Sequence, residues 1–436
     1  MRLLFCILFS LSAVTLRADD AWSRFGGSAG DFRVSSVKTT TVRNEWKREF
    51  GTGTGQVVTD GTRLYATYAI AKKGEVGDQE LTVALDTLTG KTLWEQTTTI
   101  TKRPKQESFG GEPIRPQATP TVHHGILYTV GFSGLLSARD VANGKELWST
   151  DLVADQGATP AQFGFAGSAV ILDGKLVVPV GGKHAVVAFE PKTGVRLWSS
   201  EAAEPSYATP VLITIDKQAM IVQLTRDNLF GFDIQTGKTL WSYKLPSKGM
   251  TNVPTPIAVP DGKLLVSGQG LNGTRMLQVA KSDTGFTVTE VWYQPKIQFF
   301  YTNWAADGQA VYGFPGNGGK RLTALSLKDG KILSQDLGQT DANVVLLGKE
   351  VLLCRGDGVL SLGQFTEEGF EASARGKSVT GRCWASPTVV GDIVIVRSNT
   401  ELAAIKLSSL KADFQAPPDR GVSALDAAYG GGKQSK

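Results

Sequence analysis

The sequence predicts an all-β protein: a single eight-bladed β-propeller of four-stranded antiparallel blades, in which an N-terminal strand completes the last blade. Two repeated features and one near-absence lead to this prediction. A nine-residue phrase ending in Leu-Trp recurs along the chain, a second short turn recurs between apolar runs, and helical periodicity is almost missing. Glycine supplies 50 of the 436 residues, above the average of about 7%, as expected for a chain with many tight turns.

The repeated phrase has the form Asp-x-x-Thr-Gly-Lys-x-Leu-Trp. Its clear copies occupy residues 86–94, 140–148, 190–198 and 233–241, and weaker copies lie near Thr284-Gly285, Asp329-Gly330 and Glu368-Gly369. The four strong tryptophans are 54, 50 and 43 residues apart, a period typical of a four-stranded propeller blade. The Thr-Gly or Asn-Gly pair in each copy supplies the left-handed backbone that a hairpin turn needs.

A second turn marks each unit independently, between runs that resemble the first and second strands of a blade. These turns are Asp60-Gly61, His124-Gly125, Asp173-Gly174, Asp216-Lys217, Asp261-Gly262, Asp307-Gly308, Leu347-Gly348 and Gly391-Asp392. Counting them gives eight blades.

The end of the repeat array predicts how the ring closes. The last unit has strand-like runs at 385–390, 393–397 and 401–407, but no Leu-Trp strand follows them. A strand of that type, Glu45–Phe50, stands instead before the first blade. We therefore expect this N-terminal strand to be the outer strand of the last blade, which would cover an otherwise open sheet edge.

The domain plan follows from the two ends of the chain. Residues 1–18 are predicted to be a signal peptide cleaved near Ala18, because a positive start precedes about 14 apolar or small residues. A short membrane anchor is the alternative reading. Residues 19–44 are a lead-in segment, 45–413 the propeller and 414–436 a disordered tail. We expect a periplasmic or secreted monomer without stable membrane insertion, and no nucleic-acid partner, because the formal charge of +5 forms no basic run.

The repeats, together with the blade openers Ala118-Thr-Pro120, Ala208-Thr-Pro210 and Ala385-Ser-Pro387, resemble the pyrroloquinoline-quinone-like (PQQ-like) propeller repeat. The segment Trp22–Gly27 is similar to an N-terminal Trp-x-x-Phe-Arg-Gly segment of exported bacterial members. The resemblance covers the chain from Trp22 to about Leu407. It implies the propeller fold, and the superfamily includes quinoprotein alcohol dehydrogenases and BamB-type outer-membrane assembly factors.

Two departures separate the chain from these groups. Quinoprotein alcohol dehydrogenases typically hold their quinone against a disulfide of adjacent cysteines, beside a calcium ion, whereas Cys354 and Cys383 are 29 positions apart and no dense acidic cluster stands out. BamB-type proteins are normally lipoproteins with a cysteine at the cleavage site, and none stands there. We expect no cofactor, and PQQ with calcium remains an open alternative. Whether the two cysteines pair is also left open.

Most of the conspicuous residues have a structural interpretation. We expect the repeated tryptophans to anchor the blades: Trp46, Trp94, Trp148, Trp198, Trp241 and Trp292. The sequence contains no motif for nucleophilic catalysis or for a metal site, so no catalytic residue and no metal ligand are assigned.

Binding residues are expected on the loop face, defined as the face that carries the second-to-third-strand loops and the connections between blades. Candidates for the rim of the central channel are Arg115, Gln117, Gln162, His184, Tyr207, Asn252, Asn303, Trp304, Arg382 and Trp384. Their mixture of amides, aromatic rings and arginines suits a protein partner, a polar small molecule or a glycan. The sequence thus favours an exported, non-catalytic binding or assembly scaffold, with a quinone-dependent or otherwise catalytic propeller as the alternative.

Overall fold

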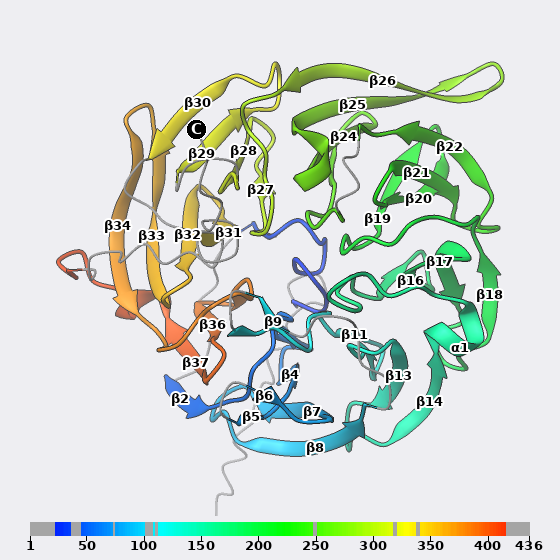
Figure 1. The fold of residues 1–436 in the computed structure, drawn as a ribbon. Coiled ribbons are helices and arrows are strands. Elements are labelled where there is room, and N and C mark those ends of the chain that lie inside the picture. Colours follow the sequence, from blue (N-terminus) through cyan, green and yellow to red (C-terminus); the bar gives the residue numbers. More distant parts are fainter. Residues whose placement is uncertain are drawn as a thin grey trace, which may run out of the picture.

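The computed structural model describes residues 22–35, 45–72, 75–100, 108–109, 112–246, 251–316, 321–336 and 341–415. The predicted signal peptide 1–18 and nearly all of the predicted tail 414–436 lie outside these ranges. The chain forms a closed ring of eight blades, each with four antiparallel strands (Figure 1). The prediction of an eight-bladed all-β propeller is confirmed. Within the described ranges, no helix is long and apolar enough to cross a membrane.

The first four blades follow one another along the chain. Blade 1 consists of β3 (Val58–Thr59), β4 (Arg63–Tyr68), β7 (Gln79–Asp86) and β8 (Thr92–Thr99). Blade 2 consists of β11 (Thr121–His123), β12 (Ile126–Val130), β13 (Leu135–Asp140) and β14 (Glu146–Asp151). Blade 3 consists of β15 (Val170–Leu172), β16 (Lys175–Gly181), β17 (His184–Phe189) and β18 (Arg196–Ser199). Blade 4 consists of β19 (Val211–Ile215), β20 (Gln218–Leu224), β21 (Asn228–Asp233) and β22 (Thr239–Lys244).

The other four blades complete the ring. Blade 5 consists of β23 (Ile257–Val259), β24 (Lys263–Gly268), β25 (Gly273–Ser282) and β26 (Gly285–Gln294). Blade 6 consists of β27 (Ala305–Ala306), β28 (Ala310–Gly313), β29 (Leu322–Ser326) and β30 (Ile332–Asp336). Blade 7 consists of β31 (Ala342–Leu347), β32 (Glu350–Arg355), β33 (Val359–Thr366) and β34 (Gly369–Lys377). Blade 8 consists of β35 (Thr388–Val390), β36 (Ile393–Arg397), β37 (Glu401–Lys406) and β2 (Trp46–Glu49).

Short elements decorate this framework. Two small hairpins are β5 (Ala71–Lys72) with β6 (Glu75–Val76), and β9 (Ser108–Phe109) with β10 (Glu112–Pro113). The helix α1 (Leu152–Gln156) follows blade 2, and single 3-10 turns are η2 (Gln269–Leu271) and η3 (Leu407–Ser409). The sequence analysis did not identify α1. Its boundary signals are local: the Asp151 carboxylate caps the backbone N–H groups of Val153 and Ala154, and Gly157 ends the helix in the left-handed region.

The predicted ring closure is confirmed. The strand β2 pairs antiparallel with β37, and Trp46 lies opposite Ala404. On the inner side of the same junction, the buried Arg397 of blade 8 donates to the carbonyl groups of Gly55 and Thr67 in blade 1, both at 2.9 Å. The first and last blades are therefore joined through strands that lie at opposite ends of the repeat array.

Five of the repeated tryptophans connect neighbouring blades. The indole of Trp46 donates to the Thr87 carbonyl at 2.9 Å and covers Gly90, where an added Cβ would lie 2.5 Å from the ring. The same arrangement recurs four times: Trp94 with Val141 and Gly144, Trp148 with Pro191 and Gly194, Trp198 with Ile234 and Gly237, and Trp292 with Leu327 and Gly330. The phrases at 86–94, 140–148 and 190–198 thus each supply a ring that packs on the next blade and a glycine that receives the ring of the preceding blade.

Trp241 differs, because blade 5 offers it no such glycine. The strands β25 and β26 are ten residues long, and their hairpin extends past the ring (Figure 1). Gly285 in the turn of that hairpin has no neighbouring atom within 4 Å of an added Cβ. The indole of Trp241 instead packs on Gly231 of its own sheet and donates to the Met220 sulfur at 3.0 Å.

Residues 22–34 of the lead-in segment cross the central channel (Figure 1). We call residues 22–34 the crossing segment. At its start, the Trp22 carbonyl accepts from the Thr59 N–H of blade 1; at its end, β1 (Arg33–Val34) pairs in parallel with β31 of blade 7. Both attachments lie toward the first-to-second-strand turns, on what we call the turn face, opposite the loop face. The buried rings of Trp22 and Phe32 belong to a hydrophobic core that blades 6, 7 and 8 share.

Candidate functional site

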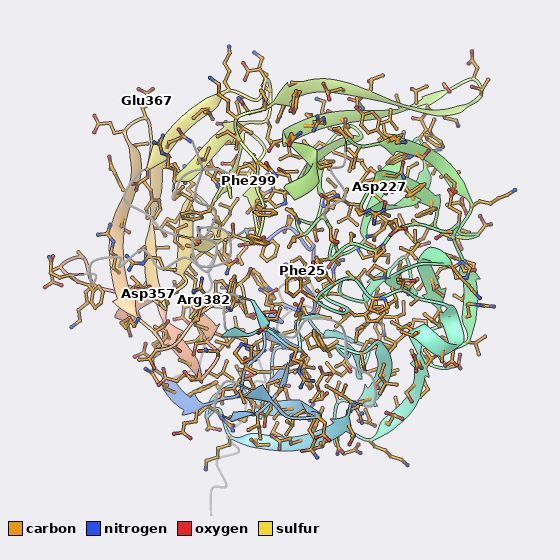
Figure 2. The ribbon with its side chains drawn as sticks, in the orientation of Figure 1. Phe25, Asp227, Phe299, Asp357, Glu367 and Arg382 are labelled. Atoms are coloured by element: carbon orange, nitrogen blue, oxygen red, sulfur yellow. The ribbon has the colours of Figure 1, made fainter. Side chains whose placement is uncertain are left out.

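A cavity of about 680 Å³ occupies the centre of the ring. The connections that enter the innermost strands form its wall, and the crossing segment contributes Arg24, Phe25, Asp31 and Phe32. Figure 2 shows Phe25 at the centre of the ring. A cavity of this size lies within the usual range for ligand pockets, about 300–1,000 Å³.

Every blade places one polar residue at a corresponding position, one to two residues before its innermost strand or at the start of it. We call this set the collar: Gln56, Thr119, Ser168, Thr209, Thr255, Asn303, Asn343 and Ser386. All except Ser168 line the cavity. The collar joins adjacent blades, because the backbone N–H at one position donates to the side-chain oxygen of the next.

The bonds of the collar are regular in the first half of the ring. The backbone N–H of Gln56 donates to Thr119 Oγ1, that of Thr119 to Ser168 Oγ, that of Ser168 to Thr209 Oγ1 and that of Thr209 to Thr255 Oγ1, at 3.0–3.2 Å. Between blades 6 and 7 the pattern recurs with amides, because the Asn303 N–H donates to Asn343 Oδ1 at 3.3 Å. The wall of the cavity is therefore built by the same bonds that hold the blades in register.

Six of the ten residues predicted at the channel rim line the cavity: Gln117, Gln162, Tyr207, Asn303, Trp304 and Trp384. Tyr207 and Gln117 both form hydrogen bonds with the backbone of one residue, Phe163, in the connection between blades 2 and 3. The Phe163 N–H donates to the Tyr207 hydroxyl at 3.0 Å, and the Phe163 carbonyl accepts from Gln117 Nε2 at 3.0 Å. Burial raises the pKa of the Tyr207 hydroxyl to about 12, so the phenol stays protonated at neutral pH.

The opposite wall is aromatic and amide-rich. Asn303 holds the backbone of Val344 with both side-chain atoms, at 2.6 and 2.8 Å. Trp304 is buried and its indole donates to the Thr255 carbonyl at 2.8 Å. Trp384 presents one ring face to the Arg382 guanidinium, whose central carbon lies 4.4 Å from the ring centroid.

The other four predicted residues do not line the cavity. The Arg382 guanidinium lies over one face of the Trp384 ring. Arg115 is fully buried, where it bonds the Gly77 carbonyl and lies 5.6 Å from the Phe132 ring centroid. Asn252 is also buried and donates to the carbonyl groups of Thr225 and Arg226. His184 is half-buried, and its Nδ1 lies 2.7 Å from the Ser200 carbonyl within blade 3.

Arg24 and Asp31 are the only charged residues that line the cavity in the described part of the chain. Burial lowers the pKa of the Arg24 guanidinium, against the opposing charge of Asp31. Burial likewise raises the pKa of the Asp31 carboxyl, against the nearby positive charges of Arg33 and Arg24. The pair makes this part of the cavity wall close to neutral overall.

Sequence reasoning missed the crossing segment and most of the collar. The openers Ala118-Thr-Pro120, Ala208-Thr-Pro210 and Ala385-Ser-Pro387 contained the signal, since each has a collar hydroxyl at its centre. Those tripeptides identify the repeat, and their central hydroxyl groups also belong to the cavity wall. Arg24 and Asp31 carried no such signal, because nothing in a linear lead-in shows that it crosses a channel.

The two cysteines lie apart from the cavity wall. Cys354 and Cys383 are free thiols, buried in the core of blade 7. A hydrogen bond with Cys383, together with burial, raises the pKa of the Cys354 thiol well above its usual value. Among the described residues, no group of three or more His, Cys, Asp or Glu side chains could hold a metal ion.

Comparisons with known proteins agree with this architecture. A family model described as outer membrane protein assembly factor BamB matches residues 77–336, more than half of the chain. The chain is 26% identical over 171 residues to the outer membrane protein assembly factor BamB of Kangiella koreensis, a match that covers 39% of this chain and 40% of that relative. The matched region thus spans well under half of the relative's length.

Two solved structures share the fold. The crystal structure of BamB from Moraxella catarrhalis superposes with a TM-score of 0.56 at 14% identity, over 84% of this chain and 98% of that one. The quinohemoprotein alcohol dehydrogenase from Comamonas testosteroni superposes with a TM-score of 0.60 at 12% identity, over 93% and 82%. At these identities the likeness concerns the fold alone.

The residues of the cavity do not fit a quinone held with calcium. A calcium ion takes six to eight oxygen ligands, rich in carboxylates, whereas Asp31 is the single acid among the described residues that line the cavity. Arg24 is likewise the single cation there, too few for an anionic quinone with several carboxylates.

Proposed function

Because the chain belongs to the family described as outer membrane protein assembly factor BamB, we propose that it is an exported, non-catalytic binding or assembly scaffold. It recognises a protein or polar ligand on the loop face around the central channel, acts as a monomer, and works in the periplasm or outside the cell after cleavage near Ala18. The observation that carries this proposal is the central cavity, to whose wall all eight blades contribute.

The rigidity of the ring supports a binding role. Interblade bonds of the collar and of the tryptophans fix the connections that form the cavity wall. A preorganised wall loses little conformational freedom when a partner binds, and this lowers the cost of association. The aromatic and amide side chains on the wall are of the kinds enriched at recognition surfaces.

Site-specific photo-crosslinking tests the proposal in the intact exported protein. A photoreactive phenylalanine analogue replaces Gln162, an exposed residue of the cavity rim on the loop face. The matched control carries the same analogue at Lys192, an exposed turn residue of blade 3 on the turn face. We expect discrete adducts with an envelope protein from position 162 and none from position 192. Equal labelling from both positions, or no adduct at all, would contradict a partner on the loop face.

A further inference from the structure

Four hydroxyl groups of the cavity wall accept a backbone N–H but donate to no protein acceptor in the described ranges. They belong to Thr119, Thr209, Thr255 and Tyr207. Each oxygen already accepts one backbone N–H, at 3.0–3.2 Å. Thr119 and Thr209 are only 3% and 4% exposed. A hydroxyl group both accepts and donates, so each of these four can still donate one hydrogen bond.

Both side-chain atoms of each collar amide already make a hydrogen bond within the protein. Gln56 accepts from the Gly26 N–H and donates to the Pro387 carbonyl. Asn303 uses both side-chain atoms on Val344, and Asn343 donates to the Trp384 carbonyl while it accepts from the Asn303 N–H. The hydroxyl hydrogens of Thr119, Thr209 and Thr255 are therefore collar donors that have no first partner within the described protein.

Much of the rest of the wall is apolar, and it carries little net charge. Aromatic rings line it from several blades and from the crossing segment: Phe25, Phe163, Tyr301, Trp304 and Trp384. Arg24 and Asp31 offset one another. A matching ligand is thus uncharged overall, rich in carbonyl oxygens, and carries apolar groups.

We propose that the cavity binds an extended, uncharged polypeptide segment, whose backbone carbonyl groups accept from these hydroxyls and whose apolar side chains pack on the aromatic wall. This inference rests on the proposed scaffold function and specifies its partner. Successive carbonyl groups of an extended chain point to opposite sides, so every second carbonyl faces the same wall of the cavity and can accept from a hydroxyl there. A neutral glycan fits less well, because its hydroxyl groups need acceptors as well as donors, and each amide oxygen of the collar already accepts a backbone N–H.

The test uses the full mature chain and a capped hexapeptide, acetyl-Thr-Tyr-Val-Phe-Ser-Val-amide, that carries a fluorophore on a polar linker. Fluorescence anisotropy measures its affinity, and maltohexaose is the matched neutral glycan. We expect the wild-type protein to bind the peptide with a dissociation constant below about 1 mM. The double variant Tyr207→Phe/Thr209→Val removes two donors and should weaken binding by about 5- to 100-fold.

Ser168→Ala is the matched control. It removes a collar bond of the same type, from the Thr119 N–H to Ser168 Oγ, but Ser168 does not line the cavity. Its peptide affinity should stay within about twofold of the wild type, since it has no donor to offer the ligand. If the double variant does not fold, Tyr207→Phe and Thr119→Val are measured singly, with an expected loss of about two- to tenfold each.

Three results would overturn the inference: no peptide binding at 1 mM, peptide binding that the donor variants leave unchanged, or displacement of the peptide by maltohexaose at lower concentration. The scaffold proposal would survive each of them. A partner that docks over the loop face can give adducts at position 162 without inserting a peptide into the cavity, so the two experiments fail separately.

Discussion

The contact between a tryptophan and the glycine of the next blade predicts a large effect for a very small substitution, Gly90→Ala. Gly90 has φ +65°, and an added Cβ would lie 2.5 Å from Trp46 Cε3. Neither partner can move freely. Trp46 is held by its pairing with Ala404 and by the bond to Thr87, and the Gly90 N–H donates to the Asp86 carbonyl at 2.9 Å.

Two costs add in this variant. A left-handed conformation costs a residue other than glycine about 1–2 kcal/mol, and overpacking a fitted contact costs about 1–3 kcal/mol. We expect Gly90→Ala to lower the free energy of unfolding by about 2–5 kcal/mol. Gly174 provides the control, because it has φ +73° and no atom within 4 Å of an added Cβ. Gly174→Ala should show the conformational cost alone, about 1–2 kcal/mol.

Thermal and urea denaturation of the two variants beside the wild type measure the difference. A double-mutant cycle with Trp46→Leu then assigns it: in that background Gly90→Ala should cost no more than Gly174→Ala, since the ring that Cβ would strike is gone. Equal unfolding midpoints for the two single variants would refute the reasoning, because they would show that the tryptophan does not press on the glycine.

Two further predictions concern the strand β2, which closes the ring, and the Asp307 carboxylate on the turn face. Removing residues 19–50 should lower the melting temperature far more than removing 19–44, because the longer deletion also takes β2 from blade 8 and exposes the edge of β37; similar melts would contradict closure by β2. Asp307 is partly desolvated, which opposes ionisation, but bonds from the N–H groups of Ala310 and Gln309 and from the Tyr312 hydroxyl hold its pKa below its usual value. Its ionised form therefore stabilises the fold above about pH 4, and this contribution is lost as the pH falls through the lowered pKa. The melting temperature of Asp307→Asn should consequently fall less between pH 7 and pH 3 than that of the wild type, and parallel curves would contradict this.

The architecture could be predicted because its signals are local. A hairpin turn needs residues that adopt left-handed backbone, and the eight first-to-second-strand turns carry Asp, His, Gly or Lys where that conformation occurs. His124, Asp173, Asp216 and Asp261 have positive φ, and so do all seven glycines of these turns. An outer-strand tryptophan that precedes the first blade predicts the closure by Trp46–Glu49. Each inference needed only a few neighbouring residues.

The cavity wall could be predicted only in part, because side-chain direction depends on irregular connections. Arg115 and Gln117 are two positions apart in one connection, yet Arg115 is buried and Gln117 lines the cavity. Asn252 and Asn303 both precede innermost strands, but Asn252 turns back onto the carbonyl groups of Thr225 and Arg226. Residue type and approximate position do not separate these cases. The path of the backbone decides them.

The collar links the stability of the ring to ligand binding. Thr209 accepts from the Ser168 N–H of the preceding blade with its hydroxyl oxygen, and its hydrogen remains available toward the cavity. A ligand that accepts this hydrogen adds a bond without removing the one between blades. Charge redistribution along such a chain also strengthens the bond already present. Since a ligand that binds only the folded state raises the free energy of unfolding by RT ln(1 + [L]/Kd), occupancy of the cavity should stabilise the whole ring and not only the blades that touch the ligand.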